Sequence, residues 1–172
     1  MNLIRLLGLL LQALSPALTP EKLVVTADRM FDAASGRVTG PATVVVDDGV
    51  IVAVNPDGVP GDASVIALGD RTLLPGLIDM HTHLTGDYFS GDHWVTMPVY
   101  ETAADWAVLG TKFARQTLEA GFTTVRDAGA LPGFPDVALM RAISRGDVAG
   151  PDVFPSGHYI SITGGHCDIT GF

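Results

Sequence analysis

The chain has 172 residues, 47% of them hydrophobic, which is enough apolar material for a folded domain with a buried core. Ten Lys and Arg residues against nineteen Asp and Glu residues give a net charge of −9, and this negative field argues against a nucleic-acid partner. The single cysteine, Cys167, excludes an internal disulfide framework.

The first 17 residues have the order of a secretory signal peptide. Met1–Arg5 carries one positive charge, Leu6–Leu14 is almost entirely apolar, and Ser15–Ala17 offers small residues for cleavage. The apolar run is too short to cross a membrane comfortably. We therefore expect a signal peptide over residues 1–17 and a periplasmic or secreted protein. The alternative is an N-terminal amphipathic helix, or a start codon assigned too far upstream, in a cytoplasmic protein.

Residues 22–72 are rich in short runs of β-branched residues. The sequence Asp-Asp-Gly at 47–49 lies between two such runs, and Asp-Gly in this position is a strong signal for a β-hairpin. These patterns predict a small all-β unit with strands at 23–27, 43–46, 50–54 and 64–68.

From residue 73 onward, apolar strands alternate with helical patterns. Thr102 is a plausible N-cap for a helix that ends before Gly121, with Asp105 as a shorter variant of the capping box and Trp106 and Phe113 in the core. Short connections between the elements predict parallel strands in an α/β arrangement. The expected strands are 76–81, 122–127 and 152–156, and a second helix is expected over 136–145.

Two loops complete this second region. One follows the first strand and holds an aromatic cluster that could form a pocket wall, and the other follows the third strand and runs from Gly157 to Gly171. The residues expected in the first loop are Tyr88, Phe89, His93, Trp94 and Tyr100.

The sequence His81-Thr82-His83 at the end of the first apolar strand is the strongest chemical feature. Residues two apart in a strand point to the same face, so both imidazoles should project together, with Asp79 one step deeper. Two neutral imidazoles can bind one divalent metal, and active sites of parallel α/β folds lie at this end of the strands. The pattern His-x-His alone is short and common, so the surrounding sequence must decide whether the pair is a metal site.

That context resembles the amidohydrolase superfamily. Residues 73–83 (LLPGLIDMHTH) resemble the segment that enters the barrel in that superfamily, and residues 120–129 (AGFTTVRDAG) resemble its second strand. Residues 156–168 (SGHYISITGGHCD) resemble the loop after the third strand in the imidazolonepropionase-related and prolidase-like dipeptidase subgroup. The resemblance implies the N-terminal part of a TIM-type (β/α)8 barrel over 73–172, preceded by part of a small β-sandwich at 22–72.

The resemblance also implies roles for individual residues. His81 and His83 would bind a divalent metal, with zinc as the expected ion and one or two ions in the full-length enzyme. Asp79, as a carboxylate at a strand end, is expected to accept a bond from a ligand histidine or a backbone amide; direct ligation of the metal is the alternative. His158 and His166 would contact the substrate carboxylate or carbonyl; the alternative is that both are bonded to the loop backbone. Cys167 would be a buried small residue and not a nucleophile.

The implied function is hydrolysis of C–N bonds, in an amide or a dipeptide-like substrate, by a metal-activated water. A hydrolase of cyclic amides or imidazolones is a rival, and so is a non-catalytic remnant or scaffold half that needs a second polypeptide. A closed barrel needs eight strands and about 250 residues. The catalytic aspartate and the remaining ligands are expected beyond Phe172. We therefore expect an inactive N-terminal portion, with the rest of the barrel as its partner and no stable membrane span.

Overall fold

The computed structural model describes residues 22–87, 91 and 93–168. The expected signal peptide at residues 1–17 lies outside this range. Within it, no helix combines the length and the apolar character that crossing a membrane requires. The chain divides into two compact units, Met1–Gly76 and Leu77–Phe172.

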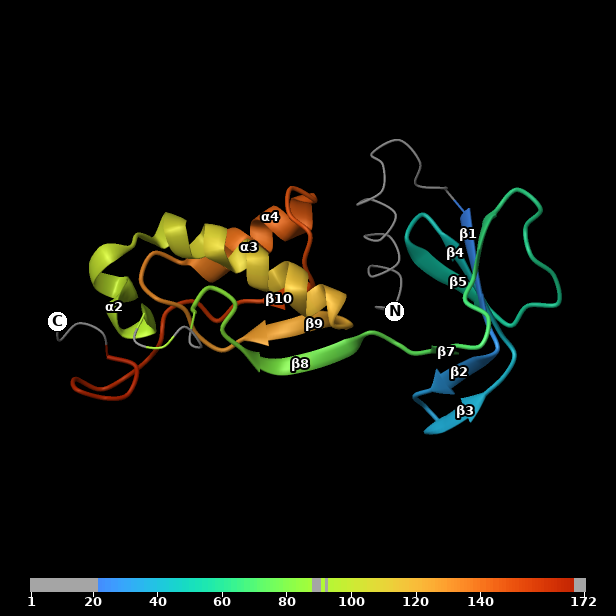
Figure 1. Cartoon of the computed structure of the whole chain (residues 1–172), viewed down its shortest axis with the longest axis horizontal. Helices are drawn as coiled ribbons and strands as arrows, with labels where there is room; N and C mark the ends of the chain where they lie inside the picture. The colour runs from blue at the N-terminus through green and yellow to red at the C-terminus, as the bar shows by residue number, and fades with distance from the viewer. Residues whose placement is uncertain (1–21, 88–90, 92, 169–172) are drawn as a thin grey trace. The chain divides into compact units, whose positions relative to one another are not determined.

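The first unit contains two small sheets (Figure 1). The larger has the order β5-β4-β1-β6, in which β1 runs antiparallel to β4 and parallel to β6. Its strands are β1 (Lys22–Ala27), β4 (Ala42–Asp47), β5 (Val50–Val54) and β6 (Ser64–Ala67). The four strands predicted from the β-branched runs are therefore confirmed, and no end differs by more than one residue.

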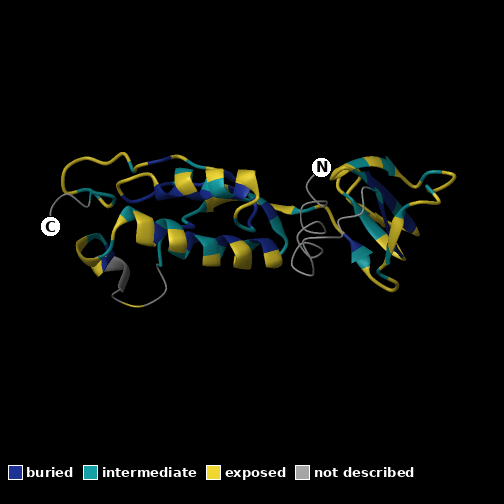
Figure 2. Ribbon diagram, turned by 90° about the horizontal axis from the view of Figure 1, so that it is seen from above, coloured by how far each residue is buried: buried dark blue, intermediate teal, exposed yellow. Residues whose placement is uncertain are grey.

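The hairpin between β4 and β5 is also confirmed. Asp48 and Gly49 have φ values of 46° and 74°, the positive values that a two-residue hairpin of the common primed type requires. Alternate residues of β1 and β4 point to one side and are buried together with Leu73, which gives this unit its own core (Figure 2). The buried set is Leu23, Val25, Ala27, Val44, Val46 and Leu73.

The smaller sheet was not expected from the sequence. It has the order β3-β2-β7 and consists of β3 (Arg37–Thr39), β2 (Arg29–Asp32) and β7 (Thr72–Leu73). These strands have two to four residues, and β3 is exposed along its whole length. Strands this short carry no readable alternation of apolar and polar residues, so only their pairing defines them.

The second unit is built on a parallel sheet with the order β10-β9-β8 (Figure 1). Its strands are β8 (Leu77–Thr82), β9 (Phe122–Asp127) and β10 (Asp152–Phe154), and its longer helices are α3 (Ala103–Glu119) and α4 (Pro135–Arg145). The predicted alternation of parallel strands and helices is confirmed, although β10 ends two residues early. The three described strands form an open sheet and not a closed barrel.

Helix α3 has the predicted N-cap. The Thr102 hydroxyl accepts a hydrogen bond from the Asp105 amide, and the Asp105 carboxylate accepts one from the Thr102 amide, so both halves of the capping box are present. The helix buries a stripe of residues four apart and leaves its outer face exposed (Figure 2). The stripe consists of Trp106, Gly110, Ala114 and Leu118, and Phe113 packs beside it, partly buried.

The prediction that the aromatic segment after β8 is entirely a loop is wrong, because residues His93–Tyr100 form helix α2. Pro98 lies inside this helix and lacks an amide hydrogen, and β-branched residues surround it, so local preference opposes a helix. Packing favours it. Met97 is only 1% exposed and belongs to a core cluster with Trp106 and Leu131.

Candidate active site

His81 and His83 lie together at the carboxyl end of β8. Their ring centroids are 5.3 Å apart and the ring planes are nearly perpendicular, at 75°. The Asp79 carboxylate turns back to accept a hydrogen bond of 3.0 Å from the His81 amide. The Thr82 hydroxyl donates to the Arg126 carbonyl on β9, which anchors the segment between the two histidines to the neighbouring strand.

The ring of His83 is held by two residues from other parts of the sheet. Its Nδ1 lies 2.9 Å from the carbonyl oxygen of Gly129, which follows β9, and 3.2 Å from the hydroxyl of Tyr159, which follows β10. The His83 and Tyr159 ring centroids are 5.7 Å apart. Residues from all three strand ends therefore meet at this histidine.

Asp127 is fully buried at the end of β9. Its carboxylate accepts hydrogen bonds from the amides of Leu84, at 2.8 Å, and Gly129, at 3.3 Å, so it joins the loops that follow β8 and β9. Burial, with a smaller contribution from the charge of Asp136, raises the pKa of Asp127 to about 6, against the lowering effect of the two backbone bonds and of His83. Asp127 is therefore a structural partner for loop amides.

His158 is bound to the backbone and to an aromatic ring. Its Nε2 accepts a hydrogen bond of 3.0 Å from the Gly133 amide, and its ring stacks on Phe134 with centroids 4.0 Å apart. The neutral ring therefore carries its hydrogen on Nδ1. His166 is exposed in the turn that follows.

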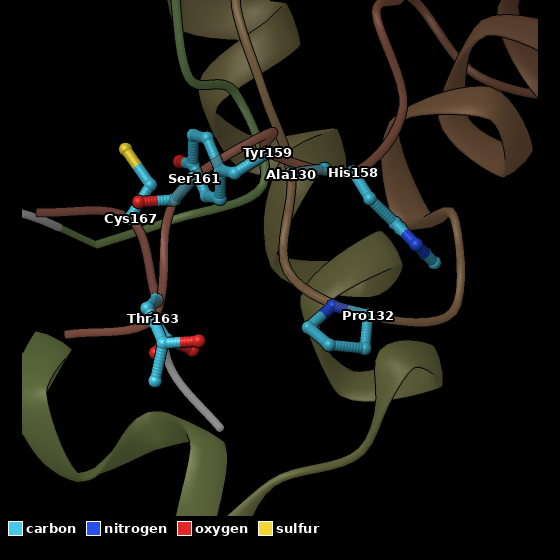
Figure 3. Close-up of a pocket in the computed structure, with 8 residues that line it drawn as sticks. Ala130, Pro132, His158, Tyr159, Ser161, Thr163 and Cys167 are labelled. Carbon is cyan, nitrogen blue, oxygen red and sulfur yellow. The ribbon is translucent and has the colours of Figure 1, made fainter. Parts of the chain in front are cut away.

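A pocket of about 310 Å³ opens beside His158 and Tyr159 (Figure 3). Tyr159 and Ser161 lie on one side of it, and Pro132 and His158 lie on the other. It is lined by Ala130, Pro132, His158, Tyr159, Ser161, Thr163, Cys167 and Asp168. His158 therefore faces a cavity that could receive a small polar molecule, whereas His166 does not line it.

Asp136 binds the backbone of the loop that follows β10. It is fully buried at the start of α4, and one carboxylate oxygen accepts a hydrogen bond of 2.8 Å from the Gly157 amide. The sequence carries no signal that marks Asp136, Gly129 or Tyr159 as site residues. Asp136 follows a proline at a helix start, which suggests a cap, but nothing local indicates that it binds a loop 21 residues away.

The histidine pair fits part of a metal site. Two imidazoles on one tetrahedral zinc, each with its nitrogen about 2.1 Å from the ion, place their ring centroids roughly 5 Å apart, close to the 5.3 Å between His81 and His83. A closed zinc site takes about four ligands. The described residues contain no group of three or more His, Cys, Asp or Glu side chains that could hold an ion, so the pair would supply only two of the four.

The sequence matches the model of the amidohydrolase family over residues 72–168. Ochratoxinase of Aspergillus niger is 36% identical over 100 residues, which cover 56% of this chain and 19% of that protein. Enamidase of Eubacterium barkeri is 33% identical over 120 residues, which cover 64% of this chain and 27% of that protein. The chain thus spans less than a third of the length of either relative.

Solved structures give similar matches over more of the chain. An Xaa-Pro dipeptidase with bound methionine in its active site superposes with a TM-score of 0.73 and 33% identity, over 87% of this chain and 36% of that one. A prolidase complexed with N-methylphosphonate-L-proline superposes with a TM-score of 0.71 and 32% identity, over 84% of this chain and 34% of that one. The matched part spans about a third of each of these structures.

Proposed function

Because the chain belongs to the amidohydrolase family, we propose that it contributes the first part of the active site of a metal-dependent hydrolase acting on the C–N bond of an amide or a dipeptide. The observation that carries this proposal is the pairing of His81 and His83, 5.3 Å apart, at the carboxyl end of a parallel strand. That end of the strands is where active sites of parallel α/β folds are built.

His81 and His83 would hold the metal, and we propose zinc because imidazole ligands suit it. When bound, such an ion lowers the pKa of a water molecule toward neutrality and polarises a substrate carbonyl. The chain's own residues orient the ligands. Asp79 holds the His81 backbone, and Asp127 holds the amides of Leu84 and Gly129 on either side of His83.

The proposed place for the substrate is the pocket lined by Tyr159, whose hydroxyl contacts His83. Hydroxyl groups of Tyr159, Ser161 and Thr163 line it together with the His158 ring, and these groups can hydrogen-bond to a carbonyl or a carboxylate. A dipeptide is favoured because an Xaa-Pro dipeptidase and a prolidase are among the similar structures. His166 lies in the same loop but does not line the pocket. It would contact a substrate only if the substrate extended beyond the pocket to this exposed side chain.

We further propose that β8, β9 and β10 are the first three strands of a (β/α)8 barrel. The sheet is open in the described residues, and the match to the similar Xaa-Pro dipeptidase covers 87% of this chain but only 36% of that one. The remaining strands would come from a further segment or a second polypeptide and would supply the missing ligands and the proton-transfer group. The chain by itself is then inactive.

Zinc titration of the purified chain tests the metal assignment. We expect weak binding, seen by calorimetry, that is lost in His81→Ala and in His83→Ala, because each substitution removes one of two ligands. His166→Ala is the matched control and should bind zinc like the unchanged chain. Tight binding that survives His81→Ala would overturn the assignment.

Turnover is tested by joining residues 22–168 to the remaining two thirds of the similar Xaa-Pro dipeptidase. With zinc or manganese, this hybrid is expected to cleave Xaa-Pro dipeptides or N-acyl amino acids, and the chain alone is expected to cleave neither. Cyclic amides belong in the same assay, and activity on them alone would favour the rival substrate class. Metal-dependent turnover by the chain alone, abolished by His83→Ala, would show that no further strands are needed.

A further inference from the structure

The side chain of His83 is contacted at one nitrogen from two directions. The Gly129 carbonyl oxygen lies 2.9 Å from Nδ1 and the Tyr159 hydroxyl lies 3.2 Å from the same atom. Gly129 and Tyr159 are 46 and 76 residues away in the sequence, beyond the ends of two different strands. The sheet therefore brings both groups to the ring, and no local pattern does.

These contacts decide which nitrogen of the neutral ring carries the hydrogen. A carbonyl oxygen only accepts hydrogen bonds, and a lone pair on Nδ1 at 2.9 Å from it would be repelled. Nδ1 therefore donates to Gly129, and the Tyr159 oxygen accepts a share of the same hydrogen. The lone pair of the ring then lies on Nε2, the nitrogen on the opposite side.

Gly129 is needed at this position for a second reason. Its φ is +149°, and a Cβ added there would overlap the ring of Tyr159. The absence of a side chain lets Tyr159 pack directly over the peptide whose carbonyl faces His83. The amide of that same peptide is the Ala130 N–H, which donates to the Gly157 carbonyl at 2.9 Å. Asp127 accepts the Gly129 amide hydrogen at 3.3 Å, so the preceding peptide is fixed as well.

We propose that Gly129 and Tyr159 are positioning residues for His83, which set the Nδ1–H tautomer and the ring orientation before any metal arrives and so present Nε2 as the ligand atom. The inference rests on the proposed function in assigning a metal to His83. Outer partners that donate to or accept from a ligand histidine typically change metal affinity by about 10- to 100-fold.

The tautomer is measured without metal. Long-range ¹H–¹⁵N correlation spectra of the purified chain distinguish Nδ1–H from Nε2–H for each histidine ring. We expect His83 to be the Nδ1–H tautomer in the unchanged chain and in Tyr159→Phe, where the Gly129 carbonyl remains. In Gly129→Ala we expect a mixture of tautomers, because the added methyl group displaces Tyr159 and the peptide below it.

Zinc affinity is measured on the same samples by following the His83 ring signals during titration, which suits weak binding. Tyr159→Phe keeps the ring and removes only the hydroxyl, and we expect an affinity about 10-fold lower. Tyr100→Phe makes the same change at a tyrosine that is 82% exposed and should leave the affinity unchanged. Gly121→Ala is the control for Gly129→Ala, since Gly121 also has a positive φ, +97°, but has open space around it.

The two proposals fail in different ways. A predominantly Nε2–H tautomer of His83 in the unchanged chain overturns the positioning role, whether or not zinc binds. An affinity of Tyr159→Phe equal to that of the unchanged chain overturns the part assigned to Tyr159. Absence of zinc binding, with the Nδ1–H tautomer present, overturns the metal assignment of the proposed function. The conclusion that the contacts of His83 set its tautomer would still hold. If Gly129→Ala does not fold, the tautomer of the unchanged chain and the zinc affinity of Tyr159→Phe still test the positioning role.

Discussion

Asp127 should make the chain less stable as the pH rises through the weakly acidic range. Its carboxyl is fully buried, and burial is the main reason that its pKa is about 6 in the folded chain, compared with 3.8 for an ordinary Asp. Between these two values the folded state holds a proton that the unfolded state has already released. The stability that this proton provides is complete below about pH 3.8 and is lost as the pH rises through about 6.

The size of the effect follows from the same values. Each pKa unit corresponds to about 1.4 kcal/mol, so the interval from 3.8 to about 6 corresponds to about 3 kcal/mol of unfolding free energy. Asp127→Asn removes the ionisable group but also replaces one acceptor oxygen with a donor. Either the Leu84 or the Gly129 amide then lacks its partner, which costs about 1–3 kcal/mol at every pH.

The assay is urea unfolding of the unchanged chain and of Asp127→Asn at several values between pH 4 and pH 8, at low protein concentration, followed by tryptophan fluorescence. We expect Asp127→Asn to be the less stable chain at pH 4 and the difference to shrink by about 3 kcal/mol by pH 8. The exposed carboxyls contribute equally to the pH dependence of both chains, so their contribution cancels in the comparison. They include Asp105, whose bond to Thr102 lowers its pKa. A difference that stays constant across the range would refute the argument from burial.

Three further predictions concern other parts of the chain. Thr102→Ala removes the N-cap of α3 and should lower the unfolding free energy by about 1 kcal/mol, measured by urea unfolding against Thr111→Ala inside the same helix; equal effects of the two changes would contradict a capping role. The isolated chain should associate at the concentrations used for size-exclusion chromatography, because the edge strand β8 exposes Leu77, Ile78 and Met80 by 46%, 57% and 66%; elution as a monomer would count against this. If residues 1–17 are a signal peptide, N-terminal sequencing of protein from the native host should begin near Leu18, and an intact Met1 or Asn2 on soluble protein would reject export.

Local sequence determined those elements whose signals lie within a few residues of one another. The hairpin at Asp48-Gly49 depends on backbone angles that these two residues readily adopt, and the start of α3 depends on the reciprocal bonds of Thr102 and Asp105. The position of His81 and His83 at a strand end was likewise readable from the apolar run that precedes them. Their role as metal ligands stays a prediction.

Tertiary structure decided the features that depend on distant partners. Helix α2 forms against the preference of Pro98 because Met97 is buried with Trp106 and Leu131. The raised pKa of Asp127 arises mainly from its burial in the packed sheet, and the hydrogen on Nδ1 of His83 arises from groups 46 and 76 residues away in the chain. A residue's sequence neighbours do not specify its burial or which of its ring nitrogens meets a carbonyl, because both depend on where separate strands end once they are packed side by side.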